Sequence, residues 1–280
     1  MIITRNNLVY SMDKENKAVA SLASGSRITF ETCDCFEDQI NSEDMSLENL
    51  DWNRINPATG PLFINGAVPG DTLEVMIEEI NVKGHATMVS GSSIRIFEVK
   101  DNALWFNEKI LLKIDPMIGV IGTAPAENPV SNNTPGFHGG NMDTKVIKKG
   151  SKIYLPVEVE GGLLAMGDLH AIMGDGEISG CGAEIAGEVT VTVNLIKGRP
   201  YPLPFIIDEK SVYTVFSAEK LDDAAESAAN AMTVHLESKG MDKLSAISIL
   251  SLVGNLQISQ IVNPLKTVRL ELSREIYEKV

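Results

Sequence analysis

The stretch from Gly167 to Glu184, GDLHAIMGDGEISGCGAE, concentrates acidic groups and glycines in a short length of chain. It contains two aspartates, two glutamates, five glycines and one of the four histidines of the protein. Carboxylates and imidazoles are ligands of divalent metal ions, and glycine lets the backbone approach a bound ion closely. Apolar segments at residues 163–166 and 188–196 flank the stretch. We therefore expect its acids to be held between buried strands, the alternative being a solvated acidic loop.

The charge balance of the 280 residues is acidic, with 24 basic against 38 acidic side chains and a net charge of −14. Such a surface repels nucleic-acid phosphates and anionic membranes, so neither is expected as a partner. No run of about eighteen apolar residues and no hydrophobic signal region near the N-terminus is present. Three cysteines do not form a disulfide framework. These features predict a soluble cytoplasmic protein.

Hydrophobic periodicity predicts a β-rich body over residues 1–200. Strands are expected at residues 27–32, 72–82, 94–99, 110–114, 163–170 and 188–196. Residues 146–147 and 153–159 are expected to pair as a hairpin. The predicted fold class is mainly β, with a sandwich-like or jelly-roll-like body.

Residues 201–280 have a different pattern and predict a smaller α+β portion packed on the β-rich body. Apolar residues at helical spacing predict a helix over residues 217–238 that ends before Gly240. Asp242 is expected to cap a second helix over residues 243–253. Two further strands are expected, at residues 256–262 and 267–272.

Asp168 and His170 lie two residues apart in a predicted strand, so both side chains point to one face and Leu169 to the other. The other acids that could join them are Asp34 at a strand end, Asp143 after a Gly-Gly-Asn turn, Asp175 and Glu177 in the following loop, and Glu184. A mixed Asp, Glu and His set suits zinc or another divalent transition metal. The excess of carboxylate oxygens also leaves room for calcium.

The cysteines have ordinary structural interpretations. Cys33 and Cys35 are expected to be buried and inert, although a Cys-x-Cys pair could also supply thiolate ligands. The acidic surroundings of Cys181 are expected to raise its thiol pKa, which argues against a catalytic nucleophile. The sequence leaves the roles of all three open.

The histidines divide in a similar way. His85 and His235 are isolated in the sequence and favour structural or surface roles. His138 lies in the polar loop of residues 123–140, and long loops without regular structure are often functional. It is therefore a candidate for contact with a substrate.

Three segments give the chain a resemblance to the acetamidase/formamidase family. They are VIGTAP at residues 120–125, GGNMD at residues 139–143, and GDLHA with GDGE at residues 167–171 and 174–177. Their order and spacing agree with that family over most of the chain. The resemblance implies a β-rich fold with a smaller α+β region, a homodimer, and hydrolysis of small aliphatic amides such as formamide and acetamide.

The resemblance also implies roles for individual residues. The metal ligands would be Asp34, Asp143, Asp168, His170 and Glu184. Glu177 would either act as general base, with Asp175 as a neighbouring acid that could do the same, or support the metal ligands without binding the ion, and His138 and Asn141 would face the substrate. A divalent ion, zinc in the first place and calcium in the second, would activate a coordinated water for attack on the amide carbonyl.

Two alternatives remain open at this point. The same ligands could serve a metal hydrolase acting on another C–N bond, such as that of a cyclic amide or ureide. Alternatively, the carboxylates could bind calcium structurally in a non-catalytic β-domain.

Overall fold

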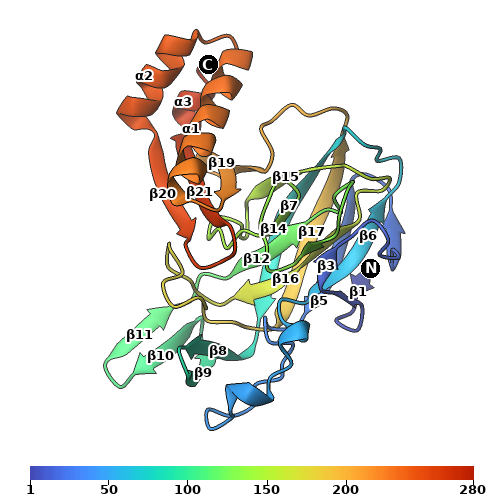
Figure 1. Ribbon diagram of the computed structural model, residues 1–280, viewed down its shortest axis with the longest axis vertical. Coiled ribbons are helices and arrows are strands. Elements are labelled where there is room, and N and C mark those ends of the chain that lie inside the picture. Colours follow the sequence, from blue (N-terminus) through green and yellow to red (C-terminus); the bar gives the residue numbers. More distant parts are fainter.

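The computed structural model describes residues 1–280, and its main feature is a pair of large β-sheets that pack around a common core, with the helices gathered at one end (Figure 1). The nine-stranded sheet has the order β1 (Ile2–Ile3), β5 (Ser26–Thr32), β17 (Gly187–Ile196), β7 (Thr72–Val82), β15 (Lys152–Pro156), β18 (Phe205–Ile207), β19 (Ser211–Ala218), β21 (Lys266–Ser273) and β20 (Asn255–Gln260). The six-stranded sheet has the order β14 (Gly139–Asn141), β12 (Met117–Gly122), β16 (Leu164–His170), β6 (Ala58–Ile64) and β2 (Leu8–Val9), and β4 (Ala20–Leu22) also pairs with β6. The mainly β sandwich expected from the sequence is confirmed.

Smaller elements complete the chain. A four-stranded sheet extends from the sandwich as an arm (Figure 1), in the order β11 (Ile110–Lys113), β10 (Ala103–Asn107), β9 (Ser93–Lys100) and β8 (Gly84–Ser90). β3 (Ser11–Met12) pairs with β13 (Val130–Ser131). The helices are α1 (Leu221–Ser238), α2 (Lys243–Val253), α3 (Arg274–Tyr277) and two 3-10 turns at Leu47–Asn49 and Trp52–Arg54. None of the helices has the length and apolarity needed to cross a bilayer.

The core between the two large sheets contains 32 buried apolar residues. On β17, Val189, Val191 and Val193 are fully buried and follow the two-residue period of a strand with one face inward. β17 lies between β5 and β7 and pairs with both over most of its length. The clearest strand of the sequence is therefore an interior strand of the larger sheet.

The C-terminal portion continues this sheet across residue 200, where the sequence places its domain boundary. β18 pairs with β15 of the body, and β19, β21 and β20 follow it. A second core of 12 buried residues packs α1 against these strands. The Asp242 carboxylate accepts a hydrogen bond from the Ser245 amide at 3.1 Å, which confirms Asp242 as the N-cap of α2.

Two expectations of local structure are wrong. Residues 146–147 do not pair with 153–159; the strand there is β15, and its partners are β7 and β18. The first long helix begins at Leu221 rather than at residue 217, because Ser217 and Ala218 remain in β19 and pair with Thr267 and Lys266. In both cases, pairing between distant segments overrides a local pattern.

Candidate active site

The site begins where β12 and β16 pair, at Gly119 and Asp168. These residues lie opposite each other, between the pairs Ile118–Leu169 and Val120–Gly167. Asp168 has a φ of 55°, in the left-handed region. Met166 and Leu169 both belong to the central core although they are three residues apart, so the strand alternation slips at this point. The slip keeps Asp168 out of the apolar core and leaves it with His170 on the face away from Leu169, as the sequence spacing predicts.

Gly119 provides the room that the acids occupy. A Cβ at this position would lie 2.5 Å from Asp168 Oδ2 and 2.6 Å from Asp143 Oδ1. Any side chain there would displace at least one of the two carboxylates. Glycine at this position is therefore required by the site.

Asp143 follows β14 and enters the same space with a φ of 40°. The Asn141 amide fits when its nitrogen faces the acids; it then donates to Asp143 Oδ2 at 3.0 Å and Asp168 Oδ2 at 3.1 Å. Asn263 Nδ2 donates to Asp143 Oδ2 at 2.6 Å. Asn141 thus holds the two carboxylates in place, and Asn263 is a site residue that the sequence analysis missed.

Glu184 and Glu177 come from the glycine-rich loop after β16. The backbone of Glu184 forms bridges with Thr87 and His170, and Glu184 Oε1 accepts from the Gly182 amide at 2.7 Å. Glu177 is buried and has a φ of 47°. Backbone hydrogen bonds of Gly176 with Ser259 of β20 and with Ile261 just after it hold this part of the loop.

His170 lies at the centre of the acidic cluster, which we define as Asp143, Asp168, His170, Glu177 and Glu184. His170 Nε2 is 3.7 Å from Asp143 Oδ1, 3.5 Å from Asp168 Oδ1 and 3.2 Å from Glu184 Oε2. Candidate ligand atoms of Asp143, Asp168 and His170 lie within 4.8 Å of one another, as do those of His170, Glu177 and Glu184. The structure thus brings together four of the five predicted ligands and the predicted general base.

Burial and mutual repulsion determine the protonation of the cluster. Burial raises the pKa of Glu177 to about 9, with a further contribution from Asp143, and raises that of Asp143 to about 6. The pKa of Glu184 is also raised, first by burial. Burial alone would lower the pKa of His170, but Asp168 and the other neighbouring carboxylates raise it to about 10. The cluster therefore holds protons that isolated carboxylates would release.

The cluster also fits a divalent ion. Ligand atoms bound to one zinc ion at about 2.0–2.3 Å lie roughly 3–4.6 Å apart, and the distances from His170 Nε2 are within that range. Asp168 Oδ1, Glu177 Oε2 and Glu184 Oε2 are buried without a hydrogen-bond partner. Buried oxygens are rarely left unpaired, and a cation next to His170 would satisfy those of Asp168 and Glu184, which both face its Nε2.

Asp34 does not join the cluster. Its Oδ1 accepts from the backbone amides of Phe36 at 3.0 Å and Asp38 at 2.7 Å, so its carboxylate holds the turn after β5. Burial raises its pKa to about 7. The neighbouring residue Cys35 is turned inward instead, and its sulfur groups with oxygens of Asp168 and Glu184 within 4.8 Å.

Cys181 lies beside this group. Its Sγ is 3.5 Å from Glu184 Oε1 and accepts from the Val89 amide at 3.3 Å. Contrary to expectation, its thiol pKa is lowered, chiefly by a hydrogen bond from Cys35, whereas burial raises that of Cys35. Cys33 is buried and takes no part in any such group, as expected of an inert thiol.

Asp175 makes ion pairs outside the cluster. Its two oxygens accept from Arg269 Nη1 and Nη2, each at 2.8 Å, and Lys145 Nζ is also 2.8 Å away. Although burial opposes the charge, Arg269 and then Lys145 lower the pKa of Asp175. A carboxylate held in this way is a poor proton acceptor, so its geometry supports positioning of the loop rather than the predicted role as a base.

His138 is buried in the loop before β14 and packs against glycines. A Cβ on Gly140 would lie 2.8 Å from its Nε2, and one on Gly136 would lie 3.2 Å from its Nδ1. Burial lowers its pKa to about 4, so the ring is neutral. The structure does not group it with the acidic cluster.

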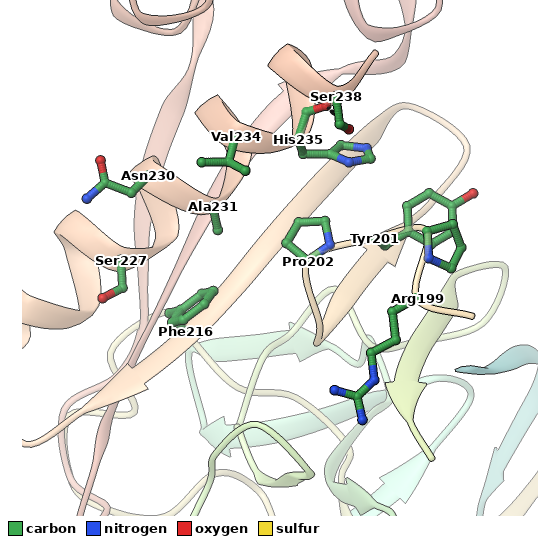
Figure 2. Close-up of a pocket in the computed structure, with 11 residues that line it drawn as sticks. Arg199, Tyr201, Pro202, Phe216, Ser227, Asn230, Ala231, Val234, His235 and Ser238 are labelled. Atoms are coloured by element: carbon green, nitrogen blue, oxygen red, sulfur yellow. Dashed lines mark hydrogen bonds between the residues drawn. The ribbon is translucent and has the colours of Figure 1, made fainter. Parts of the chain in front are cut away.

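Of two cavities of similar volume, one adjoins the acidic cluster. An apolar cavity of about 420 Å³ opens beside the cluster, and Glu177, Cys181 and Gly182 are among its lining residues. Its apolar lining consists of Met88, Phe97, Leu104, Phe106, Leu112, Ile172, Met173, Ile178 and Ala183. Figure 2 shows another cavity, of about 510 Å³, between α1 and the segment around Tyr201. No carboxylate lines it, and its His235 shares a hydrogen bond of 2.9 Å with Tyr277, in agreement with a structural role.

Fold and site together define a β-sandwich protein with a buried carboxylate–histidine centre next to an apolar cavity. The Acetamidase/Formamidase family model matches residues 12–111 and 131–279, and the chain belongs to this family. This confirms the resemblance found in the sequence.

Solved structures and a curated relative agree with this assignment. An acetamidase from Bacillus halodurans is 46% identical, with a TM-score of 0.98 and coverage of 100% of this chain and 99% of that one. A predicted acetamidase/formamidase from Thermoanaerobacter tengcongensis is 42% identical, with a TM-score of 0.96 and coverage of 99% and 97%. A putative formamidase of Schizosaccharomyces pombe is 29% identical over 63% of this chain. The alignment spans 61% of the length of that relative, about three fifths.

Replacing Gly119 by Ala should disrupt the cluster, because the new Cβ would lie 2.5 Å from Asp168 Oδ2. Disturbing the groups that orient metal ligands typically costs about 10- to 100-fold in metal affinity. Zinc affinity, measured by competition with a chromogenic chelator, should fall by about that factor. The control is Gly174→Ala, where an added Cβ meets nothing within 4 Å. Unchanged zinc affinity in Gly119→Ala would contradict the placement of the two carboxylates.

Metal-free protein should become less stable as the pH rises from about 5 to about 9. The folded-state pKa values of Glu177, Asp143 and Asp34 are raised to about 9, 6 and 7, and that of His170 to about 10. Groups with a raised folded-state pKa contribute stability that is complete below their unfolded pKa and is lost as the pH rises through the folded one. Calorimetry in chelator should show a falling melting temperature.

The substitution Glu177→Gln should flatten this decline, because it removes the carboxyl group with the widest pH window among these acids. Glu127→Gln, at an exposed position, should leave it unchanged. A melting temperature that rises over this interval in metal-free wild-type protein would contradict the assigned protonation.

Proposed function

We propose that this chain is a metal-dependent hydrolase of small aliphatic amides, which produces ammonia and a carboxylate by attack of water on the amide carbonyl. The observation that supports it most directly is the buried acidic cluster, with its unpartnered oxygens, at the wall of an apolar cavity. The family supplies the reaction class, since relatives in it are named formamidase and acetamidase.

The cluster residues would hold the ion. Ligand atoms of Asp143, Asp168 and His170 lie within 4.8 Å of one another, Glu184 Oε2 is 3.2 Å from His170 Nε2, and Asn141 fixes the two aspartates. A divalent ion bound there lowers the pKa of a coordinated water and polarises a carbonyl oxygen. Zinc is the ion proposed first, because an imidazole is among the ligands, and calcium second.

Glu177 is the residue best placed to move the proton. Only two carboxyl groups line the apolar cavity, and Asp175 is held by Arg269. Glu177 Oε2 is unpartnered and buried. It would accept the proton of the attacking water and donate it to the departing amide nitrogen. This second transfer is needed because an unprotonated amine is a poor leaving group.

The apolar cavity would receive the acyl chain of the substrate. With a volume of about 420 Å³ and a lining dominated by aliphatic and aromatic side chains, it has room for more than an acetyl group. Burial of apolar carbon in such a cavity adds binding energy that formamide and acetamide cannot supply.

The homodimer and the cytoplasmic location remain predictions from the sequence.

Amide substitutions at the two carboxyl groups of the apolar cavity, Glu177 and Asp175, separate their roles. Glu177→Gln keeps the shape of the side chain but cannot accept a proton, and it should lower kcat for acetamide hydrolysis by about 100-fold or more. Asp175→Asn should mainly lower the melting temperature, because it weakens the ion pair of the buried Arg269. Ammonia release and calorimetry measure both variants. Equal losses of kcat, or the larger loss in Asp175→Asn, would overturn the assignment of Glu177 as base.

Acyl chain length should control catalytic efficiency. Each methylene buried in the cavity contributes about 0.8 kcal/mol, so kcat/KM should rise about fourfold per carbon from acetamide to hexanamide. Leu112→Trp should abolish this gain and spare acetamide, because Leu112 lines the cavity. The matched control is Leu111→Trp, at the exposed neighbouring position of β11. A flat or falling series in the wild-type protein would show that the cavity does not bind the acyl group.

A further inference from the structure

The longest uncharged stretch of the chain, the 22 residues 244–265, lies on the outer side of the C-terminal portion (Figure 1). It contains most of α2 and all of β20. All of its residues are at least partly exposed except Ala246, Ser259 and Gln260. Because charged side chains are the ones most often found at a protein surface, an exposed stretch without any charge is unusual in a protein with 22% charged residues.

The helix α2 is apolar on both of its sides. Ala246, Ile249 and Leu250 face the second core. On the outer side, Leu244 is 76% exposed and Leu252 is 79% exposed. A helix that is apolar all round is normally buried. The outer side of α2 is therefore a surface that lacks a partner within this chain.

The strand β20 adds apolar side chains to this surface. Leu256 and Ile258 pair with Leu270 and Val268 of β21, so they lie on the face of the sheet that packs against α1. They are nevertheless 50% and 40% exposed. We define the C-terminal face as the exposed apolar residues of both elements, which are Leu244, Ile247, Leu252, Val253, Leu256 and Ile258.

The outer edge of β20 is open over most of its length. β20 is the last strand of the nine-stranded sheet, and a bridge from Gly176 covers its outer edge only at Gln260. Residues 255–258 contain no charge and no proline, the devices that commonly protect an edge strand. A second β20, related to the first by a twofold axis, can pair with this edge in the antiparallel direction.

Charge favours a second copy of the chain as the occupant. Two chains with a net charge of −14 repel each other over most of their surfaces. The uncharged stretch is where identical chains can meet without bringing acidic groups together, whereas a basic partner would be attracted to the acidic surfaces elsewhere. Its size is also suitable, because each partner contributes about 20–30 residues to an interface of standard area.

The C-terminal face continues to the active-site loop. The Ser259 carbonyl of β20 accepts from the Gly176 amide at 2.9 Å, and the Gly176 carbonyl accepts from the Ile261 amide at 3.2 Å. Ile178, in the same loop, is 78% exposed and lines the apolar cavity. A second chain paired with β20 would therefore lie beside the loop that carries Glu177.

We propose that a second copy of this chain docks on the C-terminal face, with the outer sides of the two α2 helices packed together and the two β20 strands paired antiparallel about a twofold axis. The two nine-stranded sheets then form one continuous sheet across the dimer. This assigns a surface to the homodimer that the sequence predicts.

Sedimentation of the full chain tests the assembly. At micromolar concentration, the wild-type protein should sediment at twice the chain mass of 30.3 kDa. Leu256→Asp should weaken dimerisation by at least about 100-fold, because the twofold axis buries two uncompensated carboxylates in each dimer. The matched control is Leu111→Asp, at a leucine of β11 that is 52% exposed, and it should remain dimeric.

Two results would overturn the assembly. A monomeric wild-type protein would leave the C-terminal face to a different protein. A dimer that Leu111→Asp dissociates and Leu256→Asp does not would place the interface on the arm. If Leu256→Asp fails to fold, Leu252→Asp on the outer side of α2 replaces it, and a folded Leu252→Asp that stays dimeric would contradict the proposal.

Amide hydrogen exchange tests the strand pairing separately. Exchange at residues 255–258 should be at least about 10-fold slower in the wild-type dimer than in monomeric Leu252→Asp, because pairing protects the outer amides of β20. Equal exchange in the two proteins would overturn the pairing of the β20 strands.

Discussion

The structure depends on the burial of like charges in one place. Asp143, Asp168, Glu177 and Glu184 meet around a single imidazole, and each of the four residues is at most 7% exposed. The ion pairs of Asp143, Asp168 and Glu184 are all with His170. Such a group is stable only if protons or a cation compensate the charges, because repulsion and desolvation otherwise exceed what one imidazolium can offset. The raised pKa values show the first solution, and a bound divalent ion is the second.

The backbone around the cluster is adapted to this requirement. Asp143, Asp168 and Glu177 have φ values of 40°, 55° and 47°, a conformation that costs non-glycine residues about 1–3 kcal/mol and tends to occur at functional sites. The slip at Gly119 and Asp168 takes the aspartate out of the apolar core without breaking the strand pairing. The C-terminal portion contributes as well, because Arg269 of β21 holds Asp175 and with it the loop that carries Glu177. The sandwich supplies most of the site, and the α+β portion holds the loop that carries Glu177.

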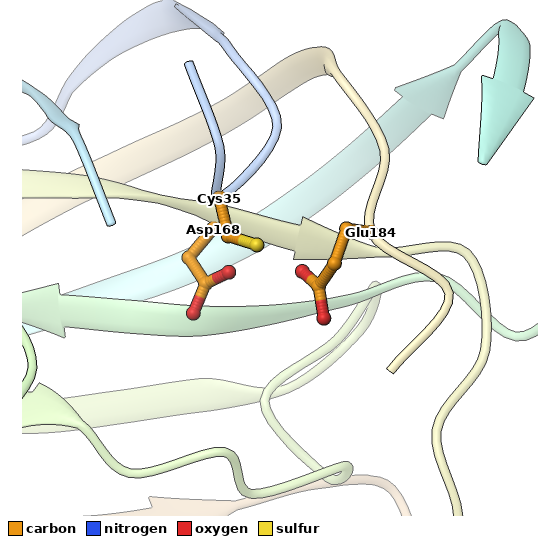
Figure 3. Close-up of side chains that lie close together, drawn as sticks. All are labelled: Cys35, Asp168 and Glu184. Carbon is orange, nitrogen blue, oxygen red and sulfur yellow. The ribbon is translucent and has the colours of Figure 1, made fainter. Parts of the chain in front are cut away.

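The sequence predicts the features that depend on local periodicity. The two-residue spacing places Asp168 and His170 on one face, and the alternation of β17 predicts a core strand, as the structure confirms. The sequence could not show that the Asp34 carboxylate would stabilise the turn after β5 while the Cys35 side chain points toward Asp168 and Glu184 (Figure 3). Which of the two side chains points inward depends on the backbone conformation after β5. An aspartate that accepts from the amide two residues later is a common turn signal and could have indicated it. The contribution of Asn263 was not accessible either, because it is about 120 residues from Asp143 and only the assembled sheet brings the two together.

The most direct test of metal-dependent amide hydrolysis is ammonia release from acetamide by one preparation, before chelation, after chelation and after zinc is restored. If the buried cluster works through a cation, chelation should lower the rate by at least about 100-fold, and zinc should restore it. Calorimetry on the same samples should show that the chelated protein is still folded, so that lost activity is not lost structure. An unchanged rate in folded protein from which the metal has been removed would contradict the account.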